Sequence, residues 1–120
     1  MLYAMLCYNS ESTVFAWSKE EDAAVMAKLD TVHKALAQKH RFGPALRLMP
    51  TTAATTLRKS DDAVLDGPYA ETKEQLLGFY IIDCPSLDEA IAAARELAKA
   101  NPGGAYEVRP VMLYVPEGEM

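Results

Sequence analysis

The sequence predicts an α+β fold of the ferredoxin-like type, a split βαβ sandwich in which two helices pack on one face of a four-stranded sheet. Three observations predict it. Strand-length segments are apolar, two serine-glutamate capping patterns each precede an apolar stripe of helical period, and the segments follow the order strand, helix, strands, strand, helix, strand.

The first half of the chain contains a strand, a long helix and a second strand. Residues 2–8 form a strand by composition, and both of its faces are apolar. The segment Ser18-Lys19-Glu20-Glu21 has the pattern of a capping box, and apolar residues then recur at three- and four-residue steps. This pattern predicts a helix over about residues 19–39, which Gly43-Pro44 ends, and a short strand over residues 45–49.

The second half contains an inserted β-hairpin, a strand, a helix and a closing strand. A threonine-rich segment, a polar turn and an apolar triplet predict the hairpin over residues 50–65. A strand at residues 77–82 follows, and a second capping box at Ser86-Leu87-Asp88-Glu89 begins a helix. The last strand is expected over residues 106–115, with a bend or an edge at Pro110 because proline cannot donate to a ladder.

Apolar residues occur on both faces of the strands that begin at Leu2, Leu77 and Tyr106. Two helices can cover only one face of the sheet, so the other face needs a second cover. A second copy of the chain is the economical one, and we therefore expect a homodimer whose sheets pack together. Residues 1–120 are expected to form a single domain.

Composition excludes several classes of function. The formal net charge is −5 and no basic patch offsets it, so nucleic-acid binding is not expected. The first residues lack the charge and the length of a signal peptide or a membrane span, which predicts a cytoplasmic protein with no membrane association. No phosphate loop, serine-hydrolase elbow or zinc-protease motif is present, and no cofactor is expected.

The histidines and cysteines give no metal or disulfide signature. His33 and His40 lie seven residues apart, about 10 Å along a helix, which is too far to bind one ion from a single chain. Cys7 and Cys84 lie near the ends of strands expected to be parallel neighbours, so their sulfurs could approach. A disulfide is nevertheless not expected in a reducing compartment.

The most distinctive segment joins a rigid turn to a core strand. It is the nonapeptide Asp66-Gly67-Pro68-Tyr69-Ala70-Glu71-Thr72-Lys73-Glu74, followed by an apolar run to Asp83. With it, the chain resembles the YCII-related family, in the branch named for an Asp-Gly-Pro-Phe motif, with Tyr69 in place of the phenylalanine. The resemblance also includes the tyrosine-rich first strand, Ser18-Lys19-Glu20-Glu21, the strand from Leu76 to Asp83, Leu87-Asp88-Glu89-Ala90, and Glu107-Val108-Arg109-Pro110-Val111.

The resemblance implies a dimeric α+β barrel among bacterial cytoplasmic proteins that are mostly uncharacterised. Relatives include an enzyme that eliminates chloride from a chlorinated hydroxyquinol, and genes of this branch often lie beside extracytoplasmic-function sigma factors. Certain shorter relatives are thought to use a His-Asp pair, but the spacing of His33 does not match that histidine, so no role is transferred.

Three residues are candidates for acid–base chemistry. Glu71 and Lys73 combine a carboxylate with an ammonium group, which could exchange a proton with a ligand or simply pair on a solvated turn. His33 lies on the apolar stripe of the first long helix, where it could act as a base in a cleft or serve as a packed histidine with one hydrogen bond.

Five further residues are candidates for shaping a ligand pocket. Tyr3 and Tyr8 could line it, and Tyr69 could donate a hydrogen bond or serve as an apolar anchor. Arg47 and Arg109 could bind an anionic ligand or edge the sheet and pair with its carboxylates.

Two functions therefore remain open. One is a cofactor-free enzyme with lyase- or isomerase-like acid–base chemistry on a small aromatic or enolisable metabolite. The other is a non-catalytic dimeric module that binds a ligand or a protein partner such as a sigma factor. Fold alone cannot separate the two, because function belongs to sites.

Overall fold

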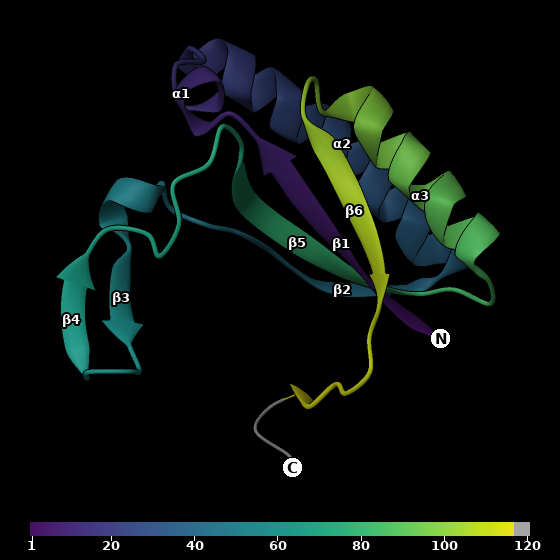
Figure 1. Cartoon of the computed structure of the whole chain (residues 1–120). Helices are drawn as coiled ribbons and strands as arrows, with labels where there is room; N and C mark the ends of the chain where they lie inside the picture. Colours follow the sequence, from purple (N-terminus) through teal and green to yellow (C-terminus); the bar gives the residue numbers. More distant parts are fainter. Residues whose placement is uncertain (117–120) are drawn as a thin grey trace.

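The structure, a computed structural model, describes residues 1–116. Within them, one sheet has the strand order β2-β5-β1-β6 with every neighbouring pair antiparallel, and β3 and β4 form a separate hairpin (Figure 1). The elements are β1 (Leu2–Asn9), α1 (Glu11–Val14), α2 (Lys19–Lys39), β2 (Arg41–Arg47), the 3-10 turn η1 (Thr51–Ala53), β3 (Thr55–Arg58), β4 (Ala63–Asp66), β5 (Gln75–Asp83), α3 (Leu87–Ala100) and β6 (Ala105–Pro110).

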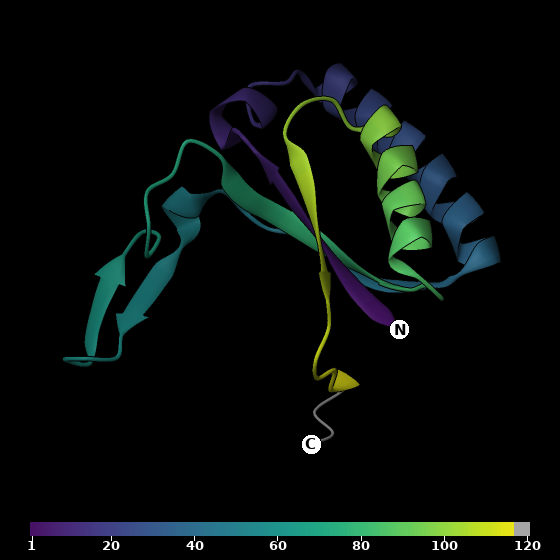
Figure 2. The same ribbon diagram turned by 45° about the vertical axis from the view of Figure 1, so that its right-hand side comes forward.

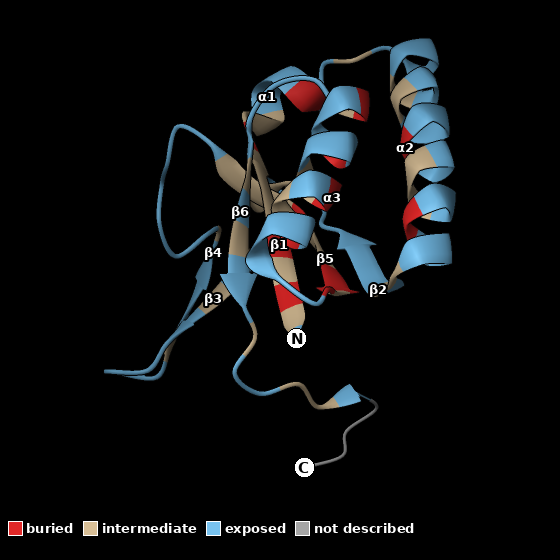
Figure 3. Ribbon diagram, turned by 90° about the vertical axis from the view of Figure 1, so that its right-hand side faces the viewer, coloured by how far each residue is buried: buried red, intermediate tan, exposed pale blue. Residues whose placement is uncertain are grey.

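Helices α2 and α3 lie side by side on one face of the four-stranded sheet (Figure 1). The helix faces that meet the sheet carry the buried residues (Figure 3). Met5, Ile82 and Leu97 are fully buried at this interface, and burying such side chains contributes about 1.5–3 kcal/mol each. The predicted ferredoxin-like α+β fold is confirmed.

Both predicted helices begin at capping serines. Ser18 Oγ accepts a hydrogen bond from the Glu21 backbone N–H at 3.0 Å, and the Glu21 carboxylate accepts one from the Ser18 N–H at 3.5 Å. Ser86 Oγ likewise accepts from the Glu89 N–H at 3.3 Å. Side-chain capping of this kind stabilises a helix by about 1 kcal/mol. The observed bounds of α2 match the predicted range of 19–39.

The strand β2 differs from its prediction. It begins at Arg41, directly after the helix, and contains the Gly43-Pro44 pair that was expected to end that helix. The register between β2 and β5 shifts between Phe42 and Ala45, and this bulge accommodates a proline that has no N–H to donate. The strand predicted over residues 45–49 therefore began too late and also ended too late, since the observed strand is Arg41–Arg47.

The last strand is also shorter than predicted. Strand β6 ends at Pro110 instead of reaching residue 115. The Val111 N–H still donates to the Leu2 carbonyl oxygen at 2.9 Å, but β1 begins at Leu2 and offers no partner beyond it. Its outer face carries Glu107 and Arg109, which are paired opposite Leu6 and Ala4 of β1. The expectation that this strand is apolar on both faces was wrong.

The cysteines lie at different ends of the sheet. Strands β1 and β5 are antiparallel, so Cys7 is paired opposite Gly78, whereas the Cys84 N–H bonds to the Met1 carbonyl oxygen at 3.0 Å. The expectation of parallel neighbours was wrong, because the hairpin insertion and the β2–β5 pairing reverse the chain before β5. Both cysteines are free thiols.

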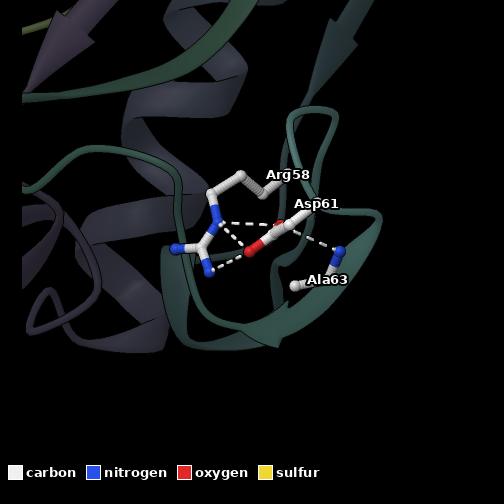
Figure 4. Close-up of polar contacts among 3 residues, drawn as sticks. All are labelled: Arg58, Asp61 and Ala63. Atoms are coloured by element: carbon white, nitrogen blue, oxygen red, sulfur yellow. Dashed lines mark hydrogen bonds and ion pairs between the residues drawn. The ribbon is translucent and has the colours of Figure 1, made fainter.

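The predicted hairpin is confirmed, and it projects away from the sheet and helices (Figure 2). Its tip is held by Arg58, whose guanidinium donates to the Asp61 carboxylate at 2.8 Å, while Asp61 accepts from the Ala63 N–H at 3.2 Å (Figure 4). At its base, Thr56 Oγ1 donates to the Gly67 carbonyl oxygen at 2.8 Å. The predicted turn at Gly67, directly after β4, is therefore hydrogen-bonded to β3 at the open end of the hairpin.

Candidate pocket between helix α2 and the sheet

A cavity of about 240 Å³ lies between α2, the segment around α1, and strands β2 and β5. Its walls are mainly apolar and include Val14, Trp17, Val25, Met26, Leu29 and Phe79. The volume is below the usual range for drug-sized ligands, which is about 300–1,000 Å³. The cavity thus suits a small molecule with one ring.

His33 and Tyr80 form the polar pair in this cavity. His33 projects from the middle of α2, and its Nε2 atom lies 3.2 Å from Tyr80 Oη on β5. The two rings meet edge to face, with centroids 5.1 Å apart, and Phe42 stacks on Tyr80 at 5.5 Å. This packing fixes the orientation of both rings. The hydroxyl donates to Nε2 when the imidazole proton is on Nδ1, and accepts from Nε2 when the proton is there.

Burial lowers the pKa of His33 below its usual 6.5, and the nearby Asp30 carboxylate only partly opposes this shift. The imidazole is therefore neutral at neutral pH, and in the tautomer with its proton on Nδ1 its Nε2 lone pair accepts the hydrogen bond from Tyr80 Oη. Burial also raises the pKa of Tyr80, so its hydroxyl keeps its proton. A neutral base and a neutral hydroxyl thus lie together at one side of the cavity.

A second polar group lies beside Tyr80, at the end of α3 and the start of β6. Asn101 Nδ2 donates to Tyr106 Oη at 2.9 Å and lies 3.7 Å from Cys7 Sγ. Burial raises the pKa values of both Tyr106 and Cys7. The phenol and the thiol are therefore neutral donors, and Cys7 is a weak nucleophile.

The cavity also contains an ion pair. Arg47, near the end of β2, donates through Nη2 to Asp22 Oδ1 in the first turns of α2 at 3.0 Å. Its guanidinium carbon lies 5.8 Å from the centroid of the Phe15 ring. Both charged side chains are about 40 per cent exposed, at 42% and 38%. The pair is therefore accessible from solvent.

Of the predicted site residues, the structure brings His33 and Arg47 to this cavity. Tyr3 lies in the hydrophobic core, with an exposed fraction of 5%. Tyr8 lies on the opposite face of the sheet, as does Arg109, which pairs with Glu107. These three residues do not line the cavity.

The remaining predicted residues lie in the segment that joins β4 to β5. Glu71 and Lys73 are exposed, and Tyr69 has an exposed fraction of 85%. None of the three lines the cavity. They lie instead next to the projecting hairpin, so any role in chemistry would need a ligand at that place.

Four polar residues of the cavity were not identified from sequence: Cys7, Asp22, Tyr80 and Asn101. The signal for Tyr80 was its spacing. Gly78, Tyr80 and Ile82 are every second residue of β5, so they share the face that packs towards α2 and α3. Cys7 of β1 is paired opposite Gly78. Polar residues on the helix-facing side of a strand would have indicated the cavity, but the sequence does not show which side of the strand faces the helices.

Within residues 1–116, no group of three or more histidine, cysteine, aspartate or glutamate residues could hold a metal ion. None of the helices in this part of the chain is long and apolar enough to cross a membrane.

The fold and the cavity define a ferredoxin-like α+β protein with a small pocket between helix and sheet. A sequence profile of the YCII-related domain matches residues 1–115, and the chain belongs to this family. It is 60% identical over 123 residues to an uncharacterised protein of Rhizobium meliloti (strain 1021), a match that spans 100% of this chain and 98% of the relative.

Proposed function

We propose that this protein is an acid–base enzyme that acts on a small aromatic or enolisable molecule in the pocket between α2 and the sheet. The observation that carries the proposal is the pair of His33 Nε2 and Tyr80 Oη, 3.2 Å apart in a mainly apolar cavity. His33 is the proposed base, and Tyr80 is the proposed hydrogen-bond donor to the substrate.

The proposed reaction begins with removal of a proton by the neutral imidazole. The substrate proton would lie on a carbon next to a carbonyl group, or on a ring hydroxyl, and would pass to Nε2 of His33. The electron pair left behind moves onto the substrate oxygen. The Tyr80 hydroxyl turns from Nε2 to this oxygen when the substrate binds, donates a hydrogen bond to it, and leaves the Nε2 lone pair free for the proton. Return of the proton to another atom gives an isomerisation, and loss of a leaving group gives an elimination.

The environment of His33 supports its role as the base. Its burial favours the neutral form, and the edge-to-face contact with Tyr80 holds the ring in place. General bases contribute about 10²–10⁴-fold to a rate. Glu71 and Lys73 remain the alternative proposed from sequence, with their charges on the exposed segment before β5.

The experiment measures exchange of the methylene protons of phenylpyruvate in D₂O by proton NMR, as the excess over buffer alone. His33→Gln should reduce the protein-dependent rate by about 10²-fold or more, and Tyr80→Phe should reduce it less. His40→Gln is the matched control, because it removes the chain's other histidine, which lies outside the pocket lining. Full exchange by His33→Gln, together with loss of exchange in Glu71→Gln or Lys73→Met, would move the site to the exposed segment.

A second candidate function is recognition without catalysis. It is favoured by the group of Cys7, Asn101 and Tyr106, which are neutral and already hydrogen-bonded to one another. Such a pocket could sense a ligand, and the dimer could dock a protein such as a sigma factor. Binding of phenylpyruvate with no proton exchange in the wild-type protein would favour this function.

We also infer that the protein is a homodimer of the branch marked by Asp66-Gly67-Pro68. The face of the sheet away from α2 and α3 carries Leu6 on β1 and Leu77 and Phe79 on β5. Apolar side chains in neighbouring strands form a continuous surface, which a second copy would bury. A stable interface of this kind hides about 1,200–2,000 Å² in total.

A further inference from the structure

We infer that the ligand of the α2–sheet pocket is an anion, a carboxylate attached to a single aromatic or enol-bearing ring, and that Arg47 binds it in exchange for Asp22. The inference rests on the proposed function, because it concerns the same pocket. Beyond the proposed function, it specifies the charge of the ligand and the residue that selects for this charge.

Some N–H groups of the Arg47 guanidinium have no acceptor among the described residues. It has five N–H groups, and among the described residues its hydrogen-bond acceptors are Asp22 Oδ1 at 3.0 Å and the thioether sulfur of Met26 at 3.7 Å. A thioether is a weak acceptor. Asp22 holds the guanidinium through one oxygen only, so a ligand carboxylate that accepts two N–H bonds in bidentate form is a stronger partner and can take its place.

Arg47 is the one lysine or arginine among the described residues that line the cavity. The chain as a whole has a net charge of −5, so its overall field does not attract anions. Binding of an anion in this cavity therefore depends on a local cation, and Arg47 is that cation.

The register of the sheet gives the expected length of the ligand. Arg47 is paired opposite Gly78, and Tyr80 lies two residues further along β5 on the same face. Two residues of a strand span about 7 Å. The backbone positions of Arg47 and Tyr80 are thus about one substituted aromatic ring apart, and Val25 and Leu29 of α2 also line the cavity.

Asp22 is the competitor for the guanidinium. Its pair with Arg47 is 38–42% exposed, and ion pairs exposed to this degree are weak because solvent screens them. A ligand carboxylate brought in by burial of its ring can therefore displace Asp22. A neutral analogue does not displace Asp22 and leaves the Arg47–Asp22 pair intact, so it should still bind, with a lower affinity than the anion.

The test uses Trp17, the single tryptophan of the chain, which lines the cavity and reports binding by its fluorescence. The probes are 4-hydroxyphenylacetate and its neutral amide, which share the ring and the hydroxyl. The wild-type protein should bind the acid about tenfold more tightly than the amide, which is the effect of one charge-assisted contact.

Three variants separate the residues. Arg47→Gln should abolish the preference for the acid, and Asp22→Asn should increase it several-fold because the competitor is gone. Arg41→Gln is the matched control, since it removes an exposed arginine of the same strand that lies outside this cavity, and it should behave as the wild type. Unchanged affinity for the amide shows that each variant keeps the pocket intact.

Equal affinities of the wild-type protein for acid and amide would overturn the inference and leave the proposed function in place. Loss of acid binding in Asp22→Asn, or wild-type preference in Arg47→Gln, would overturn it as well. If neither probe changes the Trp17 signal at millimolar concentration, the pocket does not bind such molecules, and the proposed function falls together with the inference.

Discussion

Replacement of Gly78 by alanine should force β2 and β5 apart. A Cβ atom added at Gly78 would lie 2.2 Å from the Leu46 carbonyl oxygen and 3.1 Å from Arg47 Cα. Carbon and oxygen atoms in contact across a sheet lie about 3.3 Å apart, so the strands must separate by about 1 Å. Both contacts are to backbone, which cannot rotate away as a side chain could.

The expected cost is about 2–3 kcal/mol in the free energy of unfolding. Overpacking typically costs about 1–3 kcal/mol, and separation here also stretches ladder hydrogen bonds worth about 1 kcal/mol each. For a chain of 120 residues this corresponds to a fall in Tm of roughly 10 °C. Arg47 is paired opposite Gly78 and should move too, so the variant should also bind 4-hydroxyphenylacetate less tightly.

Urea denaturation followed by circular dichroism measures the first effect, and Trp17 fluorescence measures the second. Ala45→Ser is a suitable control, because it adds one heavy atom to the adjacent strand at an exposed position and should unfold as the wild type does. An unfolding free energy of Gly78→Ala within about 0.5 kcal/mol of the wild type would refute the close approach of β2 to β5.

Burial lowers the pKa of His33, so the unfolded chain takes up a proton near pH 6.5 that the folded protein resists. The free energy of unfolding in urea should therefore fall as pH drops below about 6.5, and His33→Gln should flatten this dependence. Tyr106→Phe should lower the free energy of unfolding by about 1–2 kcal/mol, because Asn101 Nδ2 loses its acceptor at 2.9 Å; an unchanged urea midpoint would contradict that hydrogen bond. Leu6→Lys, on the sheet face away from the helices, should convert the proposed dimer to a monomer in sedimentation velocity, and a variant that stays dimeric would place the interface elsewhere.

Local signals explain why the helices could be predicted from sequence. The capping box at Ser18 and the serine cap at Ser86 act within four residues, so the starts of α2 and α3 could be predicted without knowledge of the tertiary structure. The ends of β2 and β6 depend on pairing with other strands. The bulge after Phe42 and the end of the ladder at Pro110 are set by those partners, and the sequence alone placed both boundaries wrongly.

The pocket was only partly predictable for a related reason. His33 could be selected because a titratable residue on an apolar helical stripe is unusual. Tyr80 could not, because β5 is apolar on both faces and its helix-facing side follows only from the antiparallel pairing with β1. Glu71 and Lys73 form a charged segment whose distance from the pocket depends on where the inserted hairpin points, and this direction is a property of the fold.

The most direct test of the pocket as the functional site uses the chain's two histidines. Their ring carbon–proton signals can be followed by NMR while 4-hydroxyphenylacetate is added. His33, which contacts Tyr80 in the cavity, should shift on binding and should titrate below pH 6.5 in the free protein, whereas His40, outside that cavity, should not respond to the ligand. A shift of the His40 signal with no change at His33 would contradict a functional site between α2 and the sheet.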